Sequence, residues 1–284
     1  MPHKIFIDGE AGTTGLQIRE RLQKRSDIQL IQLGDDKRKD EAARKDAINS
    51  ADAVILCLPD DAAREAVALC ENPDTCIIDA STAFRVADGW TYGFPEMTDG
   101  QREAIAASKR ITNPGCHATG FIALTRPLAE VGVIPPFFPI TATSLSGYTG
   151  GGKAMIAEFE SGQGHERIYA TALAHKHLPE MLLYSGLENA PLFSPTVANF
   201  PQGLIVEVPL HLWALPDEPD VETIRNLLQA HYAGERFLIH GFGDDDMQTA
   251  NLVAVLDNLG KGASGAAVQN LNLVLGVDES LGLS

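Results

Sequence analysis

The stretch that decides the fold is residues 4–15, KIFIDGEAGTTG. Its apolar first half has the pattern of a short strand, and its second half carries glycines spaced G-x-x-G-x-x-G before a helical pattern. At such a junction Gly9 and Gly12 let backbone N–H groups approach a pyrophosphate, and Gly15 lets the helix pack closely on the strand. A helix that begins near Thr13 or Thr14 directs its positive end at the phosphates. A tight loop without a ligand could use the same glycines, but the strand before it and the helix after it favour dinucleotide binding.

The first third of the chain repeats this order of strand and helix. Apolar runs occupy 4–8, 28–33, 53–58 and 76–79, and helical patterns lie between them at 16–24 and 62–70. This alternation of strands and helices is typical of βαβ units and predicts a parallel sheet.

The middle of the chain changes character after Pro135-Pro136. Strand patterns lie at 140–145, 168–173 and 204–212, with helical patterns at 178–187 and 221–233. We therefore predict an α/β chain, with a Rossmann-type doubly wound parallel sheet in residues 1–115 and an α+β domain in residues 116–260. Residues 261–284 are expected to form a C-terminal helix that returns to the first domain.

Composition argues against several classes of protein. The 284 residues carry a formal net charge of −16, which speaks against a general nucleic-acid surface. No apolar run approaches about 18 residues and the amino terminus lacks a signal-peptide pattern, so we expect no membrane segment and a cytoplasmic location. Four cysteines without a C-x-x-C pair predict neither a metal site nor a disulfide framework.

Residues 35–38, DDKR, follow the second predicted strand at the distance where nucleotide-binding folds read the ribose 2′ position. Lys37 and Arg38 favour a 2′-phosphate and therefore NADP(H), whereas the two preceding acids leave a 2′-hydroxyl reader open. Pro59 follows the third strand at the same sheet edge, where the cofactor is expected. Lys261 and Gly262 precede the last helix and either touch the cofactor or form the turn.

Residues 113–116, NPGC, place Cys116 at the start of an amphipathic helix that is expected to bury Phe121, Leu124, Leu128 and Val131. The first N–H groups of a helix and its macrodipole favour thiolate over thiol. The alternative is that Cys116 is a small buried hydrophobe, which is the usual role of a free cysteine.

Seven segments together resemble the short form of the N-acetyl-γ-glutamyl-phosphate reductase family of arginine biosynthesis, within the aspartate-semialdehyde-dehydrogenase-like superfamily. They are residues 9–15, 79–85 (DASTAFR), 92–96 (YGFPE), 113–116, 146–153 (SGYTGGGK), 175–180 (HKHLPE) and 261–265 (KGASG). The resemblance spans nearly the whole chain. It implies an NADP-binding Rossmann domain, an inserted catalytic and dimerisation domain, a small-molecule acyl phosphate as substrate, and a homodimer or homotetramer.

The chemistry of the residues agrees with this implication. Cys116 would attack the γ-acyl carbon and displace phosphate, hydride from NADPH would reduce the thioester, and the thiohemiacetal would collapse to the aldehyde. His175 and His177 are two apart, so on an extended segment both would face one side. Either could stabilise the thiolate and handle the proton, and we favour His177 while leaving the choice open.

Because the chain is acidic as a whole, hydrogen-bond donors for an anionic substrate must come from a local cluster of residues. Ser81 and Arg85 are the first candidates, since the planar guanidinium suits a pair of anionic oxygens, although Arg85 could equally form a structural salt bridge. Four further polar residues form a second patch, which is either a substrate site or a surface hairpin: Ser144, Ser146, Tyr148 and Lys153. Glu180 is expected to orient His177 or to cap the helix beginning at Pro179.

Three other functions are compatible with parts of the pattern. Aspartate-semialdehyde dehydrogenase shares the cofactor loop and the thiol chemistry but not the H-x-H-x-P-E segment. A lysine-pathway aminoadipyl-phosphate reductase would need a basic surface for its carrier protein, which the net charge does not encourage. A regulator that senses NADP(H) would need neither Cys116 nor the two histidines.

Overall fold

The structure is a computed structural model that describes residues 1–34, 36–235 and 238–283. The chain forms two compact units, each described here by itself. The N-terminal unit comprises residues 1–95, 99–115 and 263–284, and the central unit comprises residues 96–98 and 116–262. The chain leaves the first and enters the second between Gly115 and Cys116, inside the NPGC segment.

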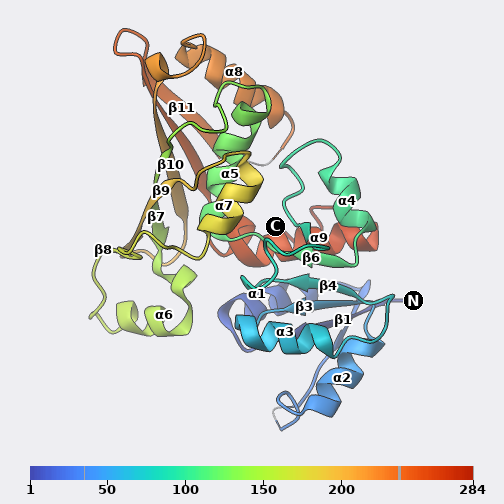
Figure 1. Cartoon of the computed structure of the whole chain (residues 1–284). Helices are drawn as coiled ribbons and strands as arrows, with labels where there is room; N and C mark the ends of the chain where they lie inside the picture. The colour runs from blue at the N-terminus through green and yellow to red at the C-terminus, as the bar shows by residue number, and fades with distance from the viewer. Residues whose placement is uncertain (35, 236–237, 284) are drawn as a thin grey trace. The chain divides into compact units, whose positions relative to one another are not determined.

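A parallel sheet forms the centre of the N-terminal unit (Figure 1). Its strands lie in the order β2-β1-β3-β4-β6-β5, and their bounds are β1 His3–Asp8, β2 Ile28–Ile31, β3 Ala53–Leu56, β4 Cys76–Asp79, β5 Thr91–Tyr92 and β6 Arg110–Thr112. The helices of this unit are α1 Thr13–Leu22, α2 Glu41–Ser50, α3 Asp60–Ala68, α4 Gln101–Ala107 and α9 Gly265–Leu275. Figure 1 shows α2 and α3 on one face of the sheet and α4 and α9 on the other.

Alternation along the strands builds a core on each face of this sheet. Ile5 and Ile7 of β1 pack with residues of α1 and α9, whereas Phe6 packs with residues of α2 and α3. All four residues of β3 are buried, as expected of a central parallel strand covered on both faces. Because β1 pairs with β2 on one side and with β3 on the other, the order of the strands reverses at β1 and β3. Ligands of such sheets bind at the carboxyl ends of the strands at this reversal.

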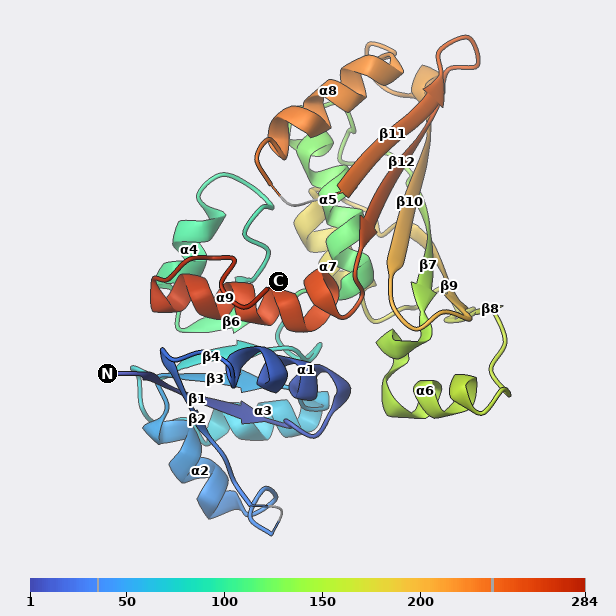
Figure 2. The same cartoon turned by 180° about the vertical axis from the view of Figure 1, so that it is seen from behind.

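A mixed sheet forms the central unit, with β7 and β9 parallel and its other neighbours antiparallel. Its strands lie in the order β11-β12-β10-β7-β9-β8. Their bounds are β7 Thr141–Gly147, β8 Arg167–Ile168, β9 Leu192–Ala198, β10 Leu204–His211, β11 Leu238–Asp244 and β12 Thr249–Leu256. The helices of this unit are α5 Cys116–Glu130, α6 Gly152–Glu160, α7 Leu178–Ser185 and α8 Val221–His231. Figure 2 shows α5, α7 and α8 on one face of the sheet, and no helix of the described chain covers the opposite face.

The predicted fold class, a Rossmann-type parallel sheet with an α+β domain, is confirmed. Two local predictions were wrong. The strand expected at 168–173 is limited to Arg167–Ile168, because Ala170 and Leu173 adopt positive φ values of 52° and 55°. Val131 is 58% exposed rather than buried, since α5 ends at Glu130 and Gly132, at φ 77°, turns the chain away. No helix among the described residues is long and apolar enough to cross a membrane.

Candidate active site

The glycine loop joins β1 to α1 and requires glycine at its first position. Gly9 has φ +87°, and a Cβ there would lie 2.3 Å from the carbonyl oxygen of Cys57. A Cβ on Gly15 would lie 2.6 Å from the carbonyl oxygen of Gly9, so helix and loop are in direct contact. Gly12 is the N-cap of α1 without a side-chain cap, and Thr13 and Thr14 form the first turn. The amino end of α1 thus has the backbone features of a phosphate site.

A cavity of about 230 Å³ lies beside this loop, at the reversal of strand order. Its lining includes Gly9, Arg38 and Lys39, with Leu33 and Leu58 as apolar walls. Arg38, predicted to contact a 2′-phosphate, lines this cavity together with Lys39. Predicted Lys37 does not line this cavity, and the acidic alternative Asp35 lies outside the described residues. Pro59 is the N-cap residue of α3.

Substitution of Gly9 with alanine is expected to weaken dinucleotide binding at least tenfold and to lower the free energy of unfolding by about 2–4 kcal/mol, because φ and the Cys57 carbonyl both oppose a Cβ. Fluorescence titration and urea unfolding measure the two effects. Gly89→Ala is the matched control, because Gly89 has φ +79° but no atom within 4 Å of an added Cβ. Equal effects of the two substitutions on the dissociation constant would contradict the prediction.

Ser81 and Arg85 lie in a buried polar cluster at the end of β4. Ser81 Oγ donates to Asp79 Oδ2 over 2.6 Å, and the Arg85 guanidinium donates to the carbonyls of Asn113 and Ala80. Burial raises the pKa of Asp79 to about 6, against the lowering effects of the Ser81 hydrogen bonds and the Arg85 charge. Arg85 is buried, and its hydrogen bond to the Asn113 carbonyl holds the turn before Cys116.

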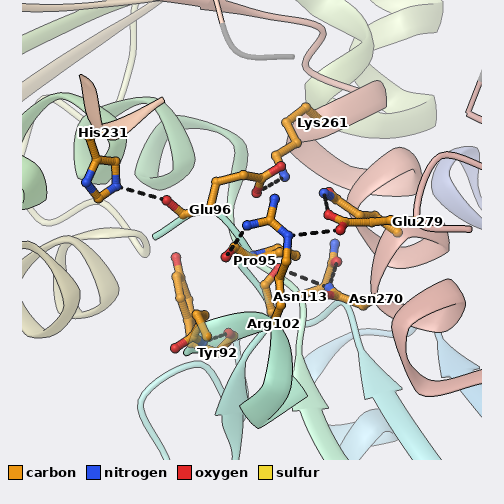
Figure 3. Close-up of polar contacts among 12 residues, drawn as sticks. Tyr92, Pro95, Glu96, Arg102, Asn113, His231, Lys261, Asn270 and Glu279 are labelled. Atoms are coloured by element: carbon orange, nitrogen blue, oxygen red, sulfur yellow. Dashed lines mark hydrogen bonds and ion pairs between the residues drawn. The ribbon is translucent and has the colours of Figure 1, made fainter. Parts of the chain in front are cut away.

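Asn113 fixes that turn through all four of its polar groups. Its backbone N–H donates to the Asp79 carbonyl, and its own carbonyl accepts from Arg85. Its side-chain amide donates to the Ala263 carbonyl, and its side-chain oxygen accepts from Asn270 on α9 (Figure 3). The residue two positions before Gly115 is therefore held rigidly by the N-terminal unit. This role of Asn270 could not be predicted from the sequence, because the pattern around a polar residue in a terminal helix does not indicate which residue it contacts.

Cys116 is the first residue of α5, as the sequence predicts. Within the central unit it lies against the backbone of Gly262, where an added Cβ would be 2.6 Å from the Cβ of Cys116. Gly262 was predicted beside the cofactor or in a turn. In the structure its N–H donates to the Asp257 carbonyl, and its lack of a side chain leaves room for the cysteine.

His175 and His177 come together by a turn rather than by an extended segment. The backbone N–H of His177 donates to Nδ1 of His175 over 3.1 Å, and the Leu178 N–H donates to the His175 carbonyl. The rings meet edge to face at a centroid distance of 4.6 Å. The two rings therefore lie side by side in a turn, as they would also do on an extended segment. Because Nδ1 of His175 accepts a hydrogen bond, its neutral ring carries the proton on Nε2.

A third histidine joins this pair. His117 follows Cys116 on α5, and its ring lies 5.4 Å from His175 and 5.5 Å from His177 between centroids. Its Nδ1 lies 3.0 Å from Ser144 Oγ on β7, and its Nε2 lies 2.6 Å from the Tyr169 hydroxyl. Sequence reasoning assigned no role to His117 or Tyr169. The position of His117 next to Cys116 was the available signal, whereas nothing in the sequence indicated Tyr169.

The burial of His117 predicts a loss of stability in acid. Burial, with smaller effects of His175 and Lys176, lowers the pKa of His117 from 6.5 to about 3. Below about pH 6.5 the His117 side chain is protonated in the unfolded chain but stays neutral in the folded one. The free energy of unfolding therefore falls as pH decreases, by up to about 1.4 kcal/mol per pH unit. Urea unfolding at pH 7.5 and 5.5 should show a drop larger by about 1 kcal/mol in the wild type than in His117→Gln. Identical drops would refute this assignment.

The remaining predicted substrate residues lie in different environments of the central unit. Glu180 is buried in the first turn of α7. Ser146 is buried on β7 and donates to the Gly147 carbonyl. Tyr148 stacks on Phe159 at a centroid distance of 5.0 Å, and Lys153 is exposed on α6. The predicted patch thus combines buried Ser144 and Ser146 with half-buried Tyr148 and exposed Lys153.

Lys261 takes part in an ion pair within the central unit (Figure 3). Its Nζ lies 2.6 Å from Glu96 Oε2, and the Glu96 side chain is 7% exposed. The Glu96 carbonyl also lies 3.1 Å from His231 Nε2. Lys261 thus ties residues 96–98 to the rest of their unit, and its proposed contact with a cofactor would require this buried pair to separate.

Comparison with known proteins assigns the family. The profile described as "Semialdehyde dehydrogenase, NAD binding domain" matches residues 4–108, and the profile "Semialdehyde dehydrogenase, dimerisation domain" matches residues 116–258. The chain is 48% identical to N-acetyl-gamma-glutamyl-phosphate reductase 2 of Nostoc over 99% of both chains. It is 49% identical to N-acetyl-gamma-glutamyl-phosphate reductase of Chelativorans over 97% of this chain and 99% of that one. The chain belongs to the N-acetyl-γ-glutamyl-phosphate reductase family. It is therefore an oxidoreductase, as the sequence resemblance predicts.

Solved structures support the fold of the family. Aspartate semialdehyde dehydrogenase II of Vibrio cholerae, complexed with ASA, aligns with a TM-score of 0.72 and 15% identity over 97% of this chain and 98% of that one. Aspartate semialdehyde dehydrogenase of Candida albicans, with NADP, aligns with a TM-score of 0.68 and 14% identity over 99% of this chain and 100% of that one. At this identity the likeness concerns the fold alone.

Proposed function

We propose that the protein reduces N-acetyl-γ-glutamyl phosphate to N-acetylglutamate 5-semialdehyde and phosphate with NADPH, a step of arginine biosynthesis. The observation that carries this proposal is identity of 48–49% over nearly full length to reductases of that name. The aspartate semialdehyde dehydrogenases share only the fold, at 14–15% identity. The site in the central unit supplies a cysteine at a helix start, and the buried His117 that follows it packs against His175 and His177.

The proposed chemistry begins at Cys116. Its thiolate attacks the γ-acyl carbon, the C–O bond to phosphate breaks, and a thioester forms on sulfur. NADPH, when bound, supplies the hydride that reduces this thioester. Protonation of the oxyanion gives a thiohemiacetal, which loses its hydroxyl proton and the thiolate to leave the aldehyde. His175 and His177 are the candidates for this proton, and the Nε2–H of His175 makes its neutral ring a donor.

The N-terminal unit fits the dinucleotide. The loop from Gly9 to Gly15 leaves backbone N–H groups at the start of α1 for the phosphates, and the adjoining cavity is lined by Arg38 and Lys39. Two cationic side chains beside the ribose position favour the 2′-phosphate of NADP(H) over the hydroxyl of NAD(H). We therefore assign NADP(H) as the cofactor.

The test is the phosphate-dependent reduction of NADP by purified protein with N-acetylglutamate semialdehyde, the more convenient reverse direction. Aspartate semialdehyde and NAD serve as the competing substrate and cofactor. The proposal expects activity with the acetylated glutamyl aldehyde and NADP, at least a hundredfold above either alternative in kcat/KM. A preference for the aspartyl aldehyde would replace the substrate, and NADP binding without either activity would overturn the proposed reaction.

We also propose that the uncovered face of the central sheet pairs with a second copy of this chain. A groove of about 1040 Å³ runs along it, with Phe137, Trp213 and Phe242 in its lining. These three side chains are 57–69% exposed, and the matching family profile is described as a dimerisation domain. Exposed apolar area of this kind is typical of an interface. Sedimentation should give a dimer or larger for the wild type and a monomer for Phe242→Glu, and a monomeric wild type would refute the assignment.

A further inference from the structure

An ion pair between Asp8 and Arg44 lies at the carboxyl end of the first strand of the N-terminal unit. Asp8 is the last residue of β1, and Arg44 lies 36 positions later on α2, which covers this face of the sheet (Figure 1). Nε and Nη2 of Arg44 both donate to Oδ2 of Asp8, over 3.0 and 2.9 Å. The Asp8 side chain is 6% exposed and that of Arg44 13%. Removal of one partner from such a pair leaves an uncompensated buried charge.

The acidic partner of this pair borders the cavity beside the glycine loop. Asp8 is one of the residues that line the cavity of about 230 Å³, next to Gly9. Arg44 is not among its lining residues. The wall of the cavity therefore contains the carboxylate, and the cation that neutralises this carboxylate lies outside the cavity.

The charges around Asp8 make Arg44 its balancing partner. Burial raises the pKa of Asp8 above its usual value, and the hydrogen bonds and charge of Arg44 oppose this rise, with a smaller effect of the Gly9 backbone. Burial, with smaller effects of Asp79 and Asp8, raises the pKa of the Cys57 thiol to about 12, so this neighbour stays uncharged. Three further charged side chains line the cavity: Glu10, Arg38 and Lys39.

A bare carboxylate in this wall would oppose a dinucleotide. The cofactor is an anion through its pyrophosphate, and NADP(H) carries a 2′-phosphate in addition. Like charges repel more strongly at a buried site than in water, because the surroundings have a lower dielectric constant and salt screens them less. Paired with Arg44, Asp8 adds no net charge to the wall.

We propose that Arg44 is a positioning residue of the cofactor site, whose guanidinium neutralises the Asp8 carboxylate so that the cavity accepts the anionic part of a dinucleotide. The inference rests on the proposed function only in placing NADP(H) in this cavity, since it concerns binding and no step of the reaction. It predicts unequal effects of the two partners. Loss of the Arg44 charge leaves an acid that repels the cofactor, whereas loss of the Asp8 charge leaves a cation that does not.

The test is the dissociation constant of NADPH, measured by fluorescence titration at pH 7.5. Arg44→Gln is expected to weaken binding by about tenfold or more, because like charges at a binding site cost several powers of e in affinity. Asp8→Asn should bind NADPH as tightly as the wild type or more tightly. The double variant Asp8→Asn/Arg44→Gln, which has neither charge, should return to within about threefold of the wild type. Arg44→Lys keeps the charge and should stay within about fivefold.

Lys45→Gln is the matched control, since it makes the same kind of change at the next position of α2. Lys45 pairs with Glu71 over 2.6 Å, but the two side chains are 42% and 70% exposed, so this variant should keep the dissociation constant within about twofold. Urea unfolding of each variant separates a loss of affinity from a loss of folded protein.

The pH dependence of binding gives a readout that a purely structural ion pair would not move. In Arg44→Gln the Asp8 carboxyl lacks the Arg44 effects that lower its pKa. Protonation of Asp8 removes the repelling charge, so the ratio of the variant to the wild-type dissociation constant should fall as pH decreases from about 8 to 5.5. The ratio cancels the titration of the 2′-phosphate itself, and it should stay flat in the double variant.

Several results would overturn the inference. Equal losses of affinity in Arg44→Gln and Asp8→Asn would make the pair structural, as would a double variant or Arg44→Lys that binds as weakly as Arg44→Gln. A tenfold loss in Asp8→Asn alone would instead assign Asp8 to direct contact with a cofactor hydroxyl. Each of these results leaves the proposed reaction standing, whereas a wild type that does not bind NADPH would overturn both this inference and the cofactor assignment.

Discussion

Replacement of Cys116 with serine is expected to lower kcat by roughly 10⁴-fold or more, because a serine hydroxyl stays protonated where a cysteine at a helix start forms a thiolate. An oxygen ester would also be reduced less readily than a thioester. Steady-state kinetics in the reverse direction measure the loss. In the forward direction without NADPH, the wild type should release one equivalent of phosphate per active subunit in a burst, and the variant should release none.

The control is Cys70→Ser, a half-buried cysteine of the N-terminal unit whose thiol donates to the Asn72 carbonyl. It should keep kcat within about twofold of the wild type. The NADP(H) dissociation constant should be the same in all three proteins, because Cys116 belongs to a unit other than the glycine loop. Retention of more than about one hundredth of the activity by Cys116→Ser would exclude an obligatory thioester.

Replacement of Gly262 with alanine is expected to have the second largest effect. The new Cβ would lie 2.6 Å from Cβ and 3.2 Å from Cα of Cys116, and 3.2 Å from the Asp257 carbonyl oxygen. One of these backbone segments must move, and the first residue of α5 is among them. A displacement on the order of 1 Å at a nucleophile costs about a hundredfold in rate. We therefore expect kcat to fall by about 10²-fold.

The same variant distinguishes the two roles considered for Gly262. If it serves to make room for Cys116, kcat falls while the NADP(H) dissociation constant stays within about threefold. If Gly262 contacts the cofactor, the NADP(H) dissociation constant rises, and kcat at saturating cofactor stays close to the wild-type value. Gly241→Ala is the control, since its added Cβ would meet only Arg225 Cβ at 3.9 Å, an ordinary contact.

Local sequence features gave correct predictions where the required physics is local. Gly9 needs positive φ and a close approach to the Cys57 carbonyl, and only glycine tolerates both, so the loop could be identified from its spacing. The helix that begins at Cys116 could be expected from the periodicity of Phe121, Leu124 and Leu128, all fully buried. The error at Val131 arose because the pattern does not reveal where Gly132 ends the helix.

Contacts between distant segments could not be predicted in this way. The turn at His175 depends on a hydrogen bond from the His177 N–H to a side-chain nitrogen, and the spacing of the two histidines does not reveal this bond. Because Lys261 opens a glycine-rich loop, its sequence allows either a cofactor contact or a role in the turn. Its partner Glu96 lies 165 positions away. The residues around Lys261 therefore do not indicate that it pairs with a buried carboxylate.

The sequence by itself determined strands β1–β4 and helices α1 and α3 of the N-terminal unit, the glycine loop, and the placement of a cysteine at a helix start. These features follow from periodicity, φ preferences and chain connectivity, which act over a few residues. Only the tertiary structure decided which side chains surround that cysteine. Gly262 lies against it, and Ser144 and Tyr169 meet the histidine beside it, because sheet pairing and helix packing bring together residues far apart in sequence.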